Sequence, residues 1–361
     1  MHRNDAQDTK GKSRYIRHQF ADKIKCELFL SCYCGSMESF WDSLPRPIFA
    51  LAPMEDVTDA AFRRLIARYG KPDVMFTEFT SADGLVLAPE SGQRALRKKL
   101  IYGEGERPIV AQLFSSSPER MEKAAQIAAG LGFDGLDINM GCPVKEVVNT
   151  GCGAALINNP ALARALIRAA KKSGLPVSVK TRIGYNADEL DSWLPELLSE
   201  EPAAITIHAR TRKDMSDVPA RWDTVARAVK LRDSLQDPRG DTSRTKTLIL
   251  GNGDVKDLNN ARTKVAETKC DGVMLGRAIY GNPWLFTDRA DPPTPYERVD
   301  ALQEHLVLFD ELLTGTTNYS TMKKHFKAYI SGWNGAKELR IRLMETESIE
   351  EARKILTNVI L

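Results

Sequence analysis

The chain has 361 residues, of which 42% are hydrophobic and 27% charged, so it can bury a large core and has the charge content of an ordinary globular protein. No segment approaches the ~18 consecutive apolar residues of a membrane-spanning helix, and six cysteines in so long a chain exclude a disulfide scaffold and fit a reducing compartment. The formal charge of +3 comes from residues 1–36, which hold seven basic and four acidic residues; the rest carries 44 of each. Bulk charge therefore does not indicate a nucleic-acid-binding protein.

The N-terminal segment, residues 1–36, is polar and largely patternless, and we expect a disordered arm. A basic region before a short apolar stretch faintly resembles a signal peptide, but Glu27 interrupts the stretch and no clear cleavage pattern follows. Cys32 and Cys34 could be half of a metal site, yet no second Cys/His pair at ligand spacing completes it. Met37 directly precedes the organised region and is a plausible alternative translation start.

From Pro47 onward, short β-branched apolar runs alternate with longer segments of helical pattern, as expected for strands that are covered on both faces. The expected strands are 48–52, 74–77, 109–113, 135–139, 177–181, 204–208, 247–250 and 272–276. The expected helices between them are 58–69, 117–130, 160–173, 188–199, 222–234 and 255–268. A (β/α)₈ barrel and a doubly wound parallel sheet both fit this alternation.

Polar residues at the carboxyl ends of the runs favour the barrel. Gln112, Asn139, Lys180, His208 and Asn252 lie at or near the ends of five different predicted strands. In a barrel these ends meet around one mouth, where catalysis takes place, whereas an open sheet would spread them along an edge. We therefore predict an α/β fold, a (β/α)₈ TIM barrel.

The pattern changes after a pair of prolines at 292–293. Three helical segments follow without a further strand, at 296–314, 318–332 and 335–358. We predict a barrel domain over residues 37–290 and a small all-helical C-terminal domain over residues 295–361.

Cys142 lies between Gly141 and Pro143 in the loop after the fourth predicted strand. A cysteine on the catalytic face of a barrel is well placed to act on a bound substrate. The alternative is a structural loop thiol, because free cysteine is commonly buried. Cys152 and Cys270 fit packing roles better.

Lys180 and His208 end consecutive strands and together indicate support for an electron-rich group. Glycine-rich loops, 251–254 and 276–281, follow the last two strands, where barrels commonly bind phosphate through backbone N–H groups. Arg277 would add a forked cation. These glycines could simply close the barrel, but both loops at the expected strands favour a phosphorylated cofactor. The chain has no Walker-type phosphate loop and no Gly-x-Gly-x-x-Gly after a strand, which argues against an ATPase or an internal NAD domain.

An ordered set of segments from Pro47 to Phe286 resembles the signature segments of the tRNA dihydrouridine synthases, and it covers the strand ends identified above. The arm before Met37 has no counterpart in this resemblance. The segments are Leu51–Arg63, Asp137–Pro143, Val179–Gly184, His208–Arg212, Gly251–Asp254 and Gly276–Trp284, and Met322–His325 is similar to a short basic motif of the family's helical domain.

The resemblance implies an FMN-dependent, NADPH-driven (or NADH-driven) oxidoreductase that reduces the C5–C6 double bond of specific tRNA uridines to 5,6-dihydrouridine. Cys142 would be the catalytic acid and Asn139 would help to fix the uracil. The cofactor would be bound by Pro53, Met54, Gln112, Lys180, His208, Asn252, Gly253, Asp254, Gly276 and Arg277. The tRNA would contact Arg182, Arg210, Arg212, Lys323, Lys324, His325 and Lys327. We further expect a cytoplasmic monomer without a bound metal.

Two alternatives stay open. A flavin barrel of the dihydroorotate or dihydropyrimidine dehydrogenase type, which acts on a free pyrimidine, would share the phosphate loops and a loop cysteine. The basic motif at 322–325 favours RNA over a free base. A tRNA-binding protein without catalysis is the second alternative, and the presence of Cys142, Lys180 and His208 argues against it.

Overall fold

The structure is a computed structural model that describes residues 39–236 and 246–359. The expected arm, the Cys32–Cys34 pair and the alternative start at Met37 lie outside the described residues. One compact unit, Ser39–Leu361, holds both the strands and the C-terminal helices. Within the described ranges, no helix combines the length and apolarity needed to cross a membrane.

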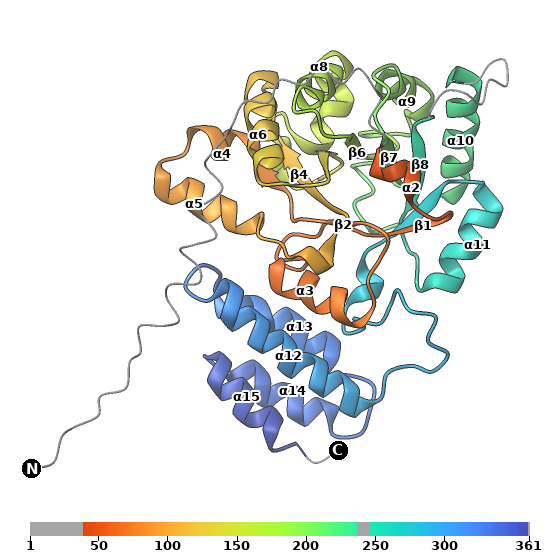
Figure 1. The fold of residues 1–361 in the computed structure, drawn as a ribbon. Coiled ribbons are helices and arrows are strands. Elements are labelled where there is room, and N and C mark those ends of the chain that lie inside the picture. The colour runs from red at the N-terminus through yellow and green to blue at the C-terminus, as the bar shows by residue number, and fades with distance from the viewer. Residues whose placement is uncertain (1–38, 237–245, 360–361) are drawn as a thin grey trace, which may run out of the picture. The chain divides into compact units, whose positions relative to one another are not determined.

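Parallel strands form a ring in the order β1-β9-β8-β7-β6-β5-β4-β2. β2 and β3 both pair with β4 and together occupy one strand position, so the barrel has the eight predicted strand positions. A parallel bridge between Ala50 and Val74 joins the first strand position to the second. The predicted TIM barrel is confirmed (Figure 1). The strands are β1 (Ile48–Leu51), β2 (Met75–Phe76), β3 (Thr80–Ser81), β4 (Ile109–Phe114), β5 (Gly135–Met140), β6 (Val177–Arg182), β7 (Ala204–His208), β8 (Leu248–Asn252) and β9 (Gly272–Leu275).

Helices cover the outside of the strands (Figure 1). Side-chain caps fix where several begin: Asp59 accepts from the N–H of Phe62, and Ser117 from that of Arg120. The six helices predicted between the strands are present, with ends within three residues of the prediction. The α-helices of the barrel are α2 (Phe40–Ser43), α3 (Ala60–Tyr69), α4 (Ala82–Leu87), α5 (Glu90–Lys99), α6 (Pro118–Gly130), α7 (Lys145–Val148), α8 (Pro160–Lys171), α9 (Leu190–Leu198), α10 (Trp222–Gln236) and α11 (Leu258–Thr268). The short 3₁₀ helices are η1 (Glu104–Glu106), η2 (Gly153–Asn158) and η3 (Arg277–Ile279).

Helix α2 closes the amino-terminal end of the barrel. Its Trp41 is buried and belongs to an apolar cluster with Phe76, Val110 and Met274 from the strands. Burial of an aromatic side chain of this size contributes roughly 2–3 kcal/mol. Because apolar side chains fill this end, the polar strand ends have only the opposite mouth in which to form a site.

The C-terminal region is all-helical, as predicted, but the expected helix over 335–358 is wrong in one respect: the segment forms two helices. Thr346 has an extended backbone, and Ser348 then starts a new helix by accepting the N–H of Glu351 at 3.2 Å. The elements are α12 (Pro295–Leu313), η4 (Tyr319–Thr321), α13 (Met322–Tyr329), α14 (Ala336–Glu345) and α15 (Ile349–Thr357).

The helical region packs against α3 of the barrel through α12 (Figure 1). Phe62 stacks on His305 with ring centroids 5.1 Å apart, and both sides contribute to one apolar core. The loop after β9 also meets α13: Gly281 has φ +68°, and a Cβ there would lie 2.2 Å from the carbonyl oxygen of Ala328. The barrel mouth and the helical region are therefore fixed against each other.

A fully buried ion pair ties α3 to the loop before β4. Arg63 Nε donates to Glu106 at 2.9 Å, and the other Glu106 oxygen accepts from Arg64 Nε at 3.0 Å and from the N–H of Gly103 at 2.8 Å. Every oxygen of the carboxylate thus has a partner, which is the condition under which a buried charge is tolerated.

We expect Glu106→Gln to lower the free energy of unfolding by about 3–5 kcal/mol, because the substitution leaves the buried Arg63 guanidinium without a counter-charge. Urea denaturation would measure the change. Glu104→Gln is the matched control: its carboxylate is 85% exposed, and its loss should cost less than about 1 kcal/mol. Equal small losses for the two variants would show that the buried pair does not stabilise the fold.

Candidate active site

Three of the polar strand ends, Lys180, His208 and Asn252, line one pocket of about 210 Å³ at the mouth of the barrel, whereas Asn139 and Cys142 lie outside its lining. The sequence-predicted cofactor residues are brought together there with one exception, Gln112, which is buried beside the pocket in a network with Asp137 and Asn139. The predicted residues in the lining are Pro53, Met54, Lys180, His208, Asn252, Gly253, Asp254, Gly276 and Arg277.

Lys180 is a cation held in a desolvated position. Its Nζ donates to Asn252 Oδ1 at 3.2 Å, and Asn252 in turn donates from Nδ2 to the carbonyl of Met274 at 2.7 Å. Burial, aided by the nearby Arg182, lowers the pKa of Lys180 to about 8. At neutral pH the ammonium group is still charged, and because burial penalises that charge, an electron-rich partner in the pocket would be bound favourably.

His208 is a neutral imidazole. Burial lowers its pKa well below the ordinary value, and the charges of Lys180, Arg182 and Arg210 lower it further. Its Nε2 lies 3.2 Å from Nη1 of Arg210. Because arginine can only donate, Nε2 accepts, and the neutral ring must carry its proton on Nδ1. His208 therefore offers one neutral N–H donor.

The glycine-rich end of the pocket carries paired guanidinium groups. Asp254 accepts from Arg210 Nη2 at 2.5 Å and from Arg277 Nη2 at 2.8 Å. Gly253 has φ +126°, and a Cβ at that position would lie 2.8 Å from the Cβ of Ala220. The Asp254 carboxylate thus orients two guanidinium groups. Beside them lies the backbone of Gly253, where the space is too small for a larger side chain.

A chain of hydrogen bonds positions the Cys142 loop. Asn139 Oδ1 accepts from the N–H groups of Gly141 at 3.1 Å and Cys142 at 2.9 Å, and Asn139 Nδ2 donates to Gln112 Oε1 at 3.2 Å. Gln112 Nε2 donates to Asp137 at 2.7 Å. The amides of Asn139 and Gln112 are therefore each held at both ends, and the backbone of the loop is fixed by the strand below it.

Sequence reasoning missed Asp137. It is fully buried, accepts from Gln112 and from the Ser178 hydroxyl at 2.6 Å, and burial raises its pKa to about 6. The signal was present, because Asp137 precedes Asn139 by two residues and alternate residues of a strand share a face.

Cys142 itself is half-buried, and burial raises the pKa of its thiol above the ordinary value. The charges of Arg182 and Lys180 act on it in the opposite direction, which places the thiol near the cationic pocket. The thiol therefore keeps its proton at neutral pH and can act as a proton donor.

The structure does not support the expected tRNA contacts of Arg182 and Arg210, because both side chains are buried. Arg182 donates from Nε to the carbonyl of Gly141 and from Nη1 to those of Thr211 and Met215, each at 2.8 Å. It clamps the Cys142 loop to the loop after β7, which leaves it no freedom to reach RNA in this conformation.

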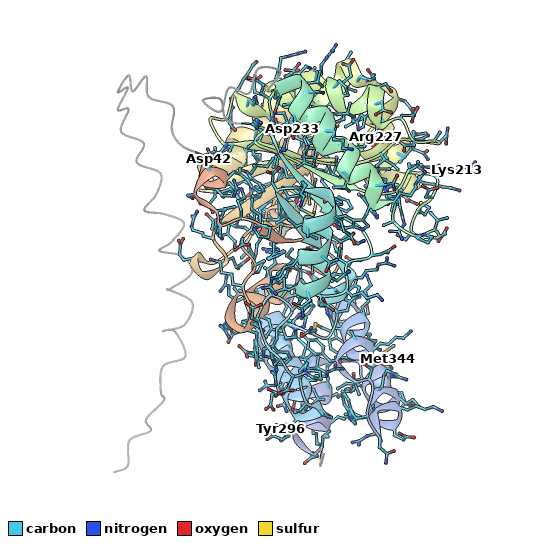
Figure 2. The ribbon with its side chains drawn as sticks, turned by 90° about the vertical axis from the view of Figure 1, so that its right-hand side faces the viewer. Asp42, Lys213, Arg227, Asp233, Tyr296 and Met344 are labelled. Atoms are coloured by element: carbon cyan, nitrogen blue, oxygen red, sulfur yellow. The ribbon has the colours of Figure 1, made fainter. Side chains whose placement is uncertain are left out.

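Arg212 and Lys213, in the loop after β7, are cations closer to the surface of the protein. The guanidinium of Arg212 lies 5.2 Å from the ring centroid of Tyr185, a cation–π arrangement. Lys213, which sequence reasoning did not single out, is exposed and extends outward from the barrel (Figure 2).

The predicted basic motif of α13 divides between the surface and the core. Lys324 and Lys327 are exposed, and Lys323 is half-buried with its Nζ 2.9 Å from the carbonyl of Met344. Lys324 forms an ion pair with Asp56 at 2.8 Å, which brings α13 beside the loop that follows β1. We call the three lysines the α13 patch. Its Lys324 lies beside a loop at the mouth of the barrel.

His325 is not part of the α13 patch, contrary to the prediction. It is fully buried, and the centroid of its ring lies 4.9 Å from that of Phe62 and 4.6 Å from that of His305. Its spacing from Met322 and Tyr329 is that of one helix face, and this face packs on the barrel. An RNA contact by the His325 side chain is therefore excluded in this conformation.

Comparison with known proteins decides the family. The dihydrouridine synthase family model matches residues 50–360. The chain belongs to the dihydrouridine synthase family. It is an enzyme, an oxidoreductase, and the family expected from the signature segments is confirmed.

Two relatives match most of the chain. The probable tRNA-dihydrouridine synthase 2 of Bacillus subtilis (strain 168) is 43% identical over 321 residues, which are 88% of this chain and 96% of the relative. The probable tRNA-dihydrouridine synthase of Staphylococcus aureus (strain COL) is 41% identical over 321 residues, 88% of this chain and 95% of the relative. Among solved structures, morphinone reductase is similar with a TM-score of 0.49 and 14% identity, covering 72% of this chain and 91% of that one.

This dihydrouridine synthase has two buried histidines where its helices meet. Neither ring nitrogen of His305 or His325 has a hydrogen-bond partner among the described residues, and the Tyr329 hydroxyl beside them has none either. Burial lowers the pKa of His325 to about 3, with Lys324 adding to the effect, and burial also lowers that of His305. Both rings are neutral in the folded protein and would become charged in the unfolded chain below about pH 6.5.

Below about pH 6.5 each of the two histidines should lower the free energy of unfolding by up to about 1.4 kcal/mol per pH unit, because the unfolded state takes up protons that the folded state refuses. Asp59 and Asp137, whose pKa values burial raises to about 6, and Glu78, whose pKa burial raises to about 7, act in the opposite direction over the same range. The measurement is therefore the difference between two proteins. Between pH 7 and 5 the urea midpoint of the variant His305→Leu with His325→Leu should fall less, or rise more, than that of the wild type. The same change of midpoint in both proteins would contradict this role of the pair.

Proposed function

We propose that this dihydrouridine synthase reduces the C5–C6 double bond of uridines in tRNA, with FMN bound in the mouth pocket and NADPH as the reductant. The observation that carries the proposal is the joint placement of a cationic, phosphate-compatible pocket and a protonated cysteine thiol at one barrel mouth. The relatives are named as probable tRNA-dihydrouridine synthases, which supports tRNA as the substrate.

The chemistry of the pocket fits a flavin mononucleotide. Lys180 and the N–H of His208 would support the edge of the ring on which negative charge collects. Gln112 is buried outside the pocket lining, with its amide held by Asp137 and Asn139, so it would act by fixing Asn139. Gly253 and Arg277 are suited to the phosphate, since Arg277 is 61% exposed and could exchange Asp254 for a dianion. Bound and reduced, the flavin would supply a hydride to C6 of the uracil.

The chain's own residues would supply the proton that completes the reduction. A thiol whose pKa is raised by burial holds its proton at neutral pH, so Cys142 can donate it to C5 on the face opposite the hydride. Asn139 would position the uracil, because its amide is fixed between Gln112 and the Cys142 loop. Arg182 would hold that loop in place through the carbonyl of Gly141.

A uridine inside folded tRNA must leave its stack to enter this pocket, at a cost of a few kcal/mol. Contacts to the RNA backbone would offset this cost, and the α13 patch, Arg212 and Lys213 are the cations placed to make them. In this proposal residues 37–290 are the catalytic barrel and residues 295–361 are a tRNA-binding domain.

The decisive test is Cys142→Ala. The variant should keep flavin absorbance and NADPH oxidation yet lose at least about 100-fold in dihydrouridine formation, because only the proton donor is missing. Quantifying dihydrouridine in treated tRNA by mass spectrometry measures the loss. Cys152→Ala, which removes a buried thiol of the neighbouring segment, is the control and should retain activity.

Three outcomes would contradict the proposal in different ways. Full product formation by Cys142→Ala would remove Cys142 from its role. Protein that takes up no FMN would end the flavoprotein assignment. Turnover of free uracil without tRNA would favour a free-pyrimidine reductase.

The α13 patch gives a second test. Lys324→Ala with Lys327→Ala should weaken tRNA binding and reduce the slope of log K against log salt by roughly 1.5, because two phosphate contacts are lost. FMN affinity should not change. Lys337→Ala with Lys354→Ala removes the same charge from two other exposed lysines of the helical region and is the control. The same loss of affinity in both double variants would show that α13 contributes only bulk charge.

A further inference from the structure

A second polar cluster lies beside the mouth and has no role in the reaction proposed above. Glu55 and Asp56 are in the loop after β1, and Glu78 follows β2. One carboxylate oxygen from each of the three lies within 4.8 Å of the others. Asp56 donates its N–H to Glu78 Oε1 at 2.6 Å, so the backbone of one loop fixes the carboxylate of the other.

A fourth carboxylate points to a ligand in this place. Asp59 is 4% exposed; its Oδ1 caps α3, whereas its Oδ2 has no hydrogen-bond partner among the described residues. Asp59, Asp56 and Glu78 line the same pocket, whose volume is about 210 Å³. Leaving a buried acceptor unpaired is unfavourable, so a donor or a cation in this pocket would be stabilised.

The lysines around the cluster satisfy only part of it. Lys99 pairs with Glu55, and Lys324 pairs with Asp56 at 2.8 Å, but the second oxygen of Glu55 is also buried without a partner. Two buried carboxylate oxygens, Oε2 of Glu55 and Oδ2 of Asp59, therefore remain without a donor among the described residues, although Lys98 and Lys99 line the same pocket.

We propose that Glu55, Asp56 and Glu78 bind a divalent cation of the Mg²⁺ class, with Asp59 accepting from a metal-bound water. Hard divalent cations prefer carboxylate oxygens and keep several waters, which suits three ligands and an unpaired acceptor in a small pocket. An acceptor that binds the metal-bound water orients this water and strengthens the site.

Cation binding would compete with the lysines. A divalent ion on Asp56 and Glu55 replaces Lys324 and Lys99 as the counter-charge, and both side chains are partly exposed and able to move away. If the proposed function holds, the released Lys324 becomes available to the tRNA backbone. The site itself does not depend on that function, because it is tested on the protein alone.

The test is the binding of Mn²⁺ to the purified full chain, followed by the loss of the free-ion electron paramagnetic resonance signal. The wild type should take up about one equivalent with a dissociation constant on the order of 10⁻⁴ M. Glu78→Gln, which keeps an acceptor for the Asp56 N–H, should bind at least about tenfold more weakly. Glu90→Gln is the matched control, since its carboxylate is 82% exposed on α5, and it should bind like the wild type.

Lys324→Met provides a result of opposite sign. Because the lysine and the ion compete for Asp56, removing the lysine should tighten Mn²⁺ binding about threefold or more, an effect that general loss of structure would not produce. If Glu78→Gln fails to fold, Glu55→Gln replaces it in the same comparison. Wild-type and Glu78→Gln proteins that bind Mn²⁺ equally, or not at all, would overturn the site, and looser binding by Lys324→Met would overturn the competition.

Discussion

Closure of the parallel barrel is the constraint on which the site depends. The ring is completed where β1 pairs with β9 and where Ala50 bridges to Val74. Closure brings Pro53 and Met54, which follow β1, into one pocket with Gly276 and Arg277, which follow β9. The apolar plug around Trp41 contributes to the same result, because it fills one end of the barrel and leaves the other for polar groups.

One physical cause, the burial of ionisable groups at the mouth, sets the protonation states of Lys180, His208 and Cys142. Burial penalises the charged form of every group, so it lowers the pKa of Lys180 and His208 and raises that of Cys142. The consequences differ because the groups differ: the lysine stays charged at neutral pH, the histidine becomes a neutral donor and the thiol keeps its proton. The proposed reduction, in which a substrate receives a hydride and a proton, would use the charged lysine, the neutral histidine and the protonated thiol together.

The sequence predicts the barrel well, because apolar runs mark the strands. The rule that strand ends share one mouth brings together Lys180, His208, Asn252 and the two glycine-rich loops, whereas Pro53 and Met54 are expected in the pocket only through the resemblance to the family. The roles of charged residues are harder to predict. Nothing local shows that Arg182 would be covered by the loops whose carbonyls it binds.

Other misses were within reach of the pattern. His325 lies on the helix face of Met322 and Tyr329, and this spacing predicts burial more directly than the adjacent lysines predict exposure. The break between α14 and α15 was marked by Ser348 three residues before Glu351, a start signal inside an otherwise continuous helical pattern.

Residues 37–361 carry equal numbers of basic and acidic side chains, so their binding of a polyanion would depend on how the cations are paired rather than on how many there are. Arg277 is held by Asp254 and Lys324 by Asp56, so an incoming phosphate must exchange with a carboxylate at either position. Such an exchange gains less than binding to a free cation, and it favours a ligand that makes further contacts at the same time. Under the proposed function, a tRNA that binds Lys324 would also have Arg212, Lys213 and Lys327 within its surface of contact, so its selectivity would follow from where these cations lie.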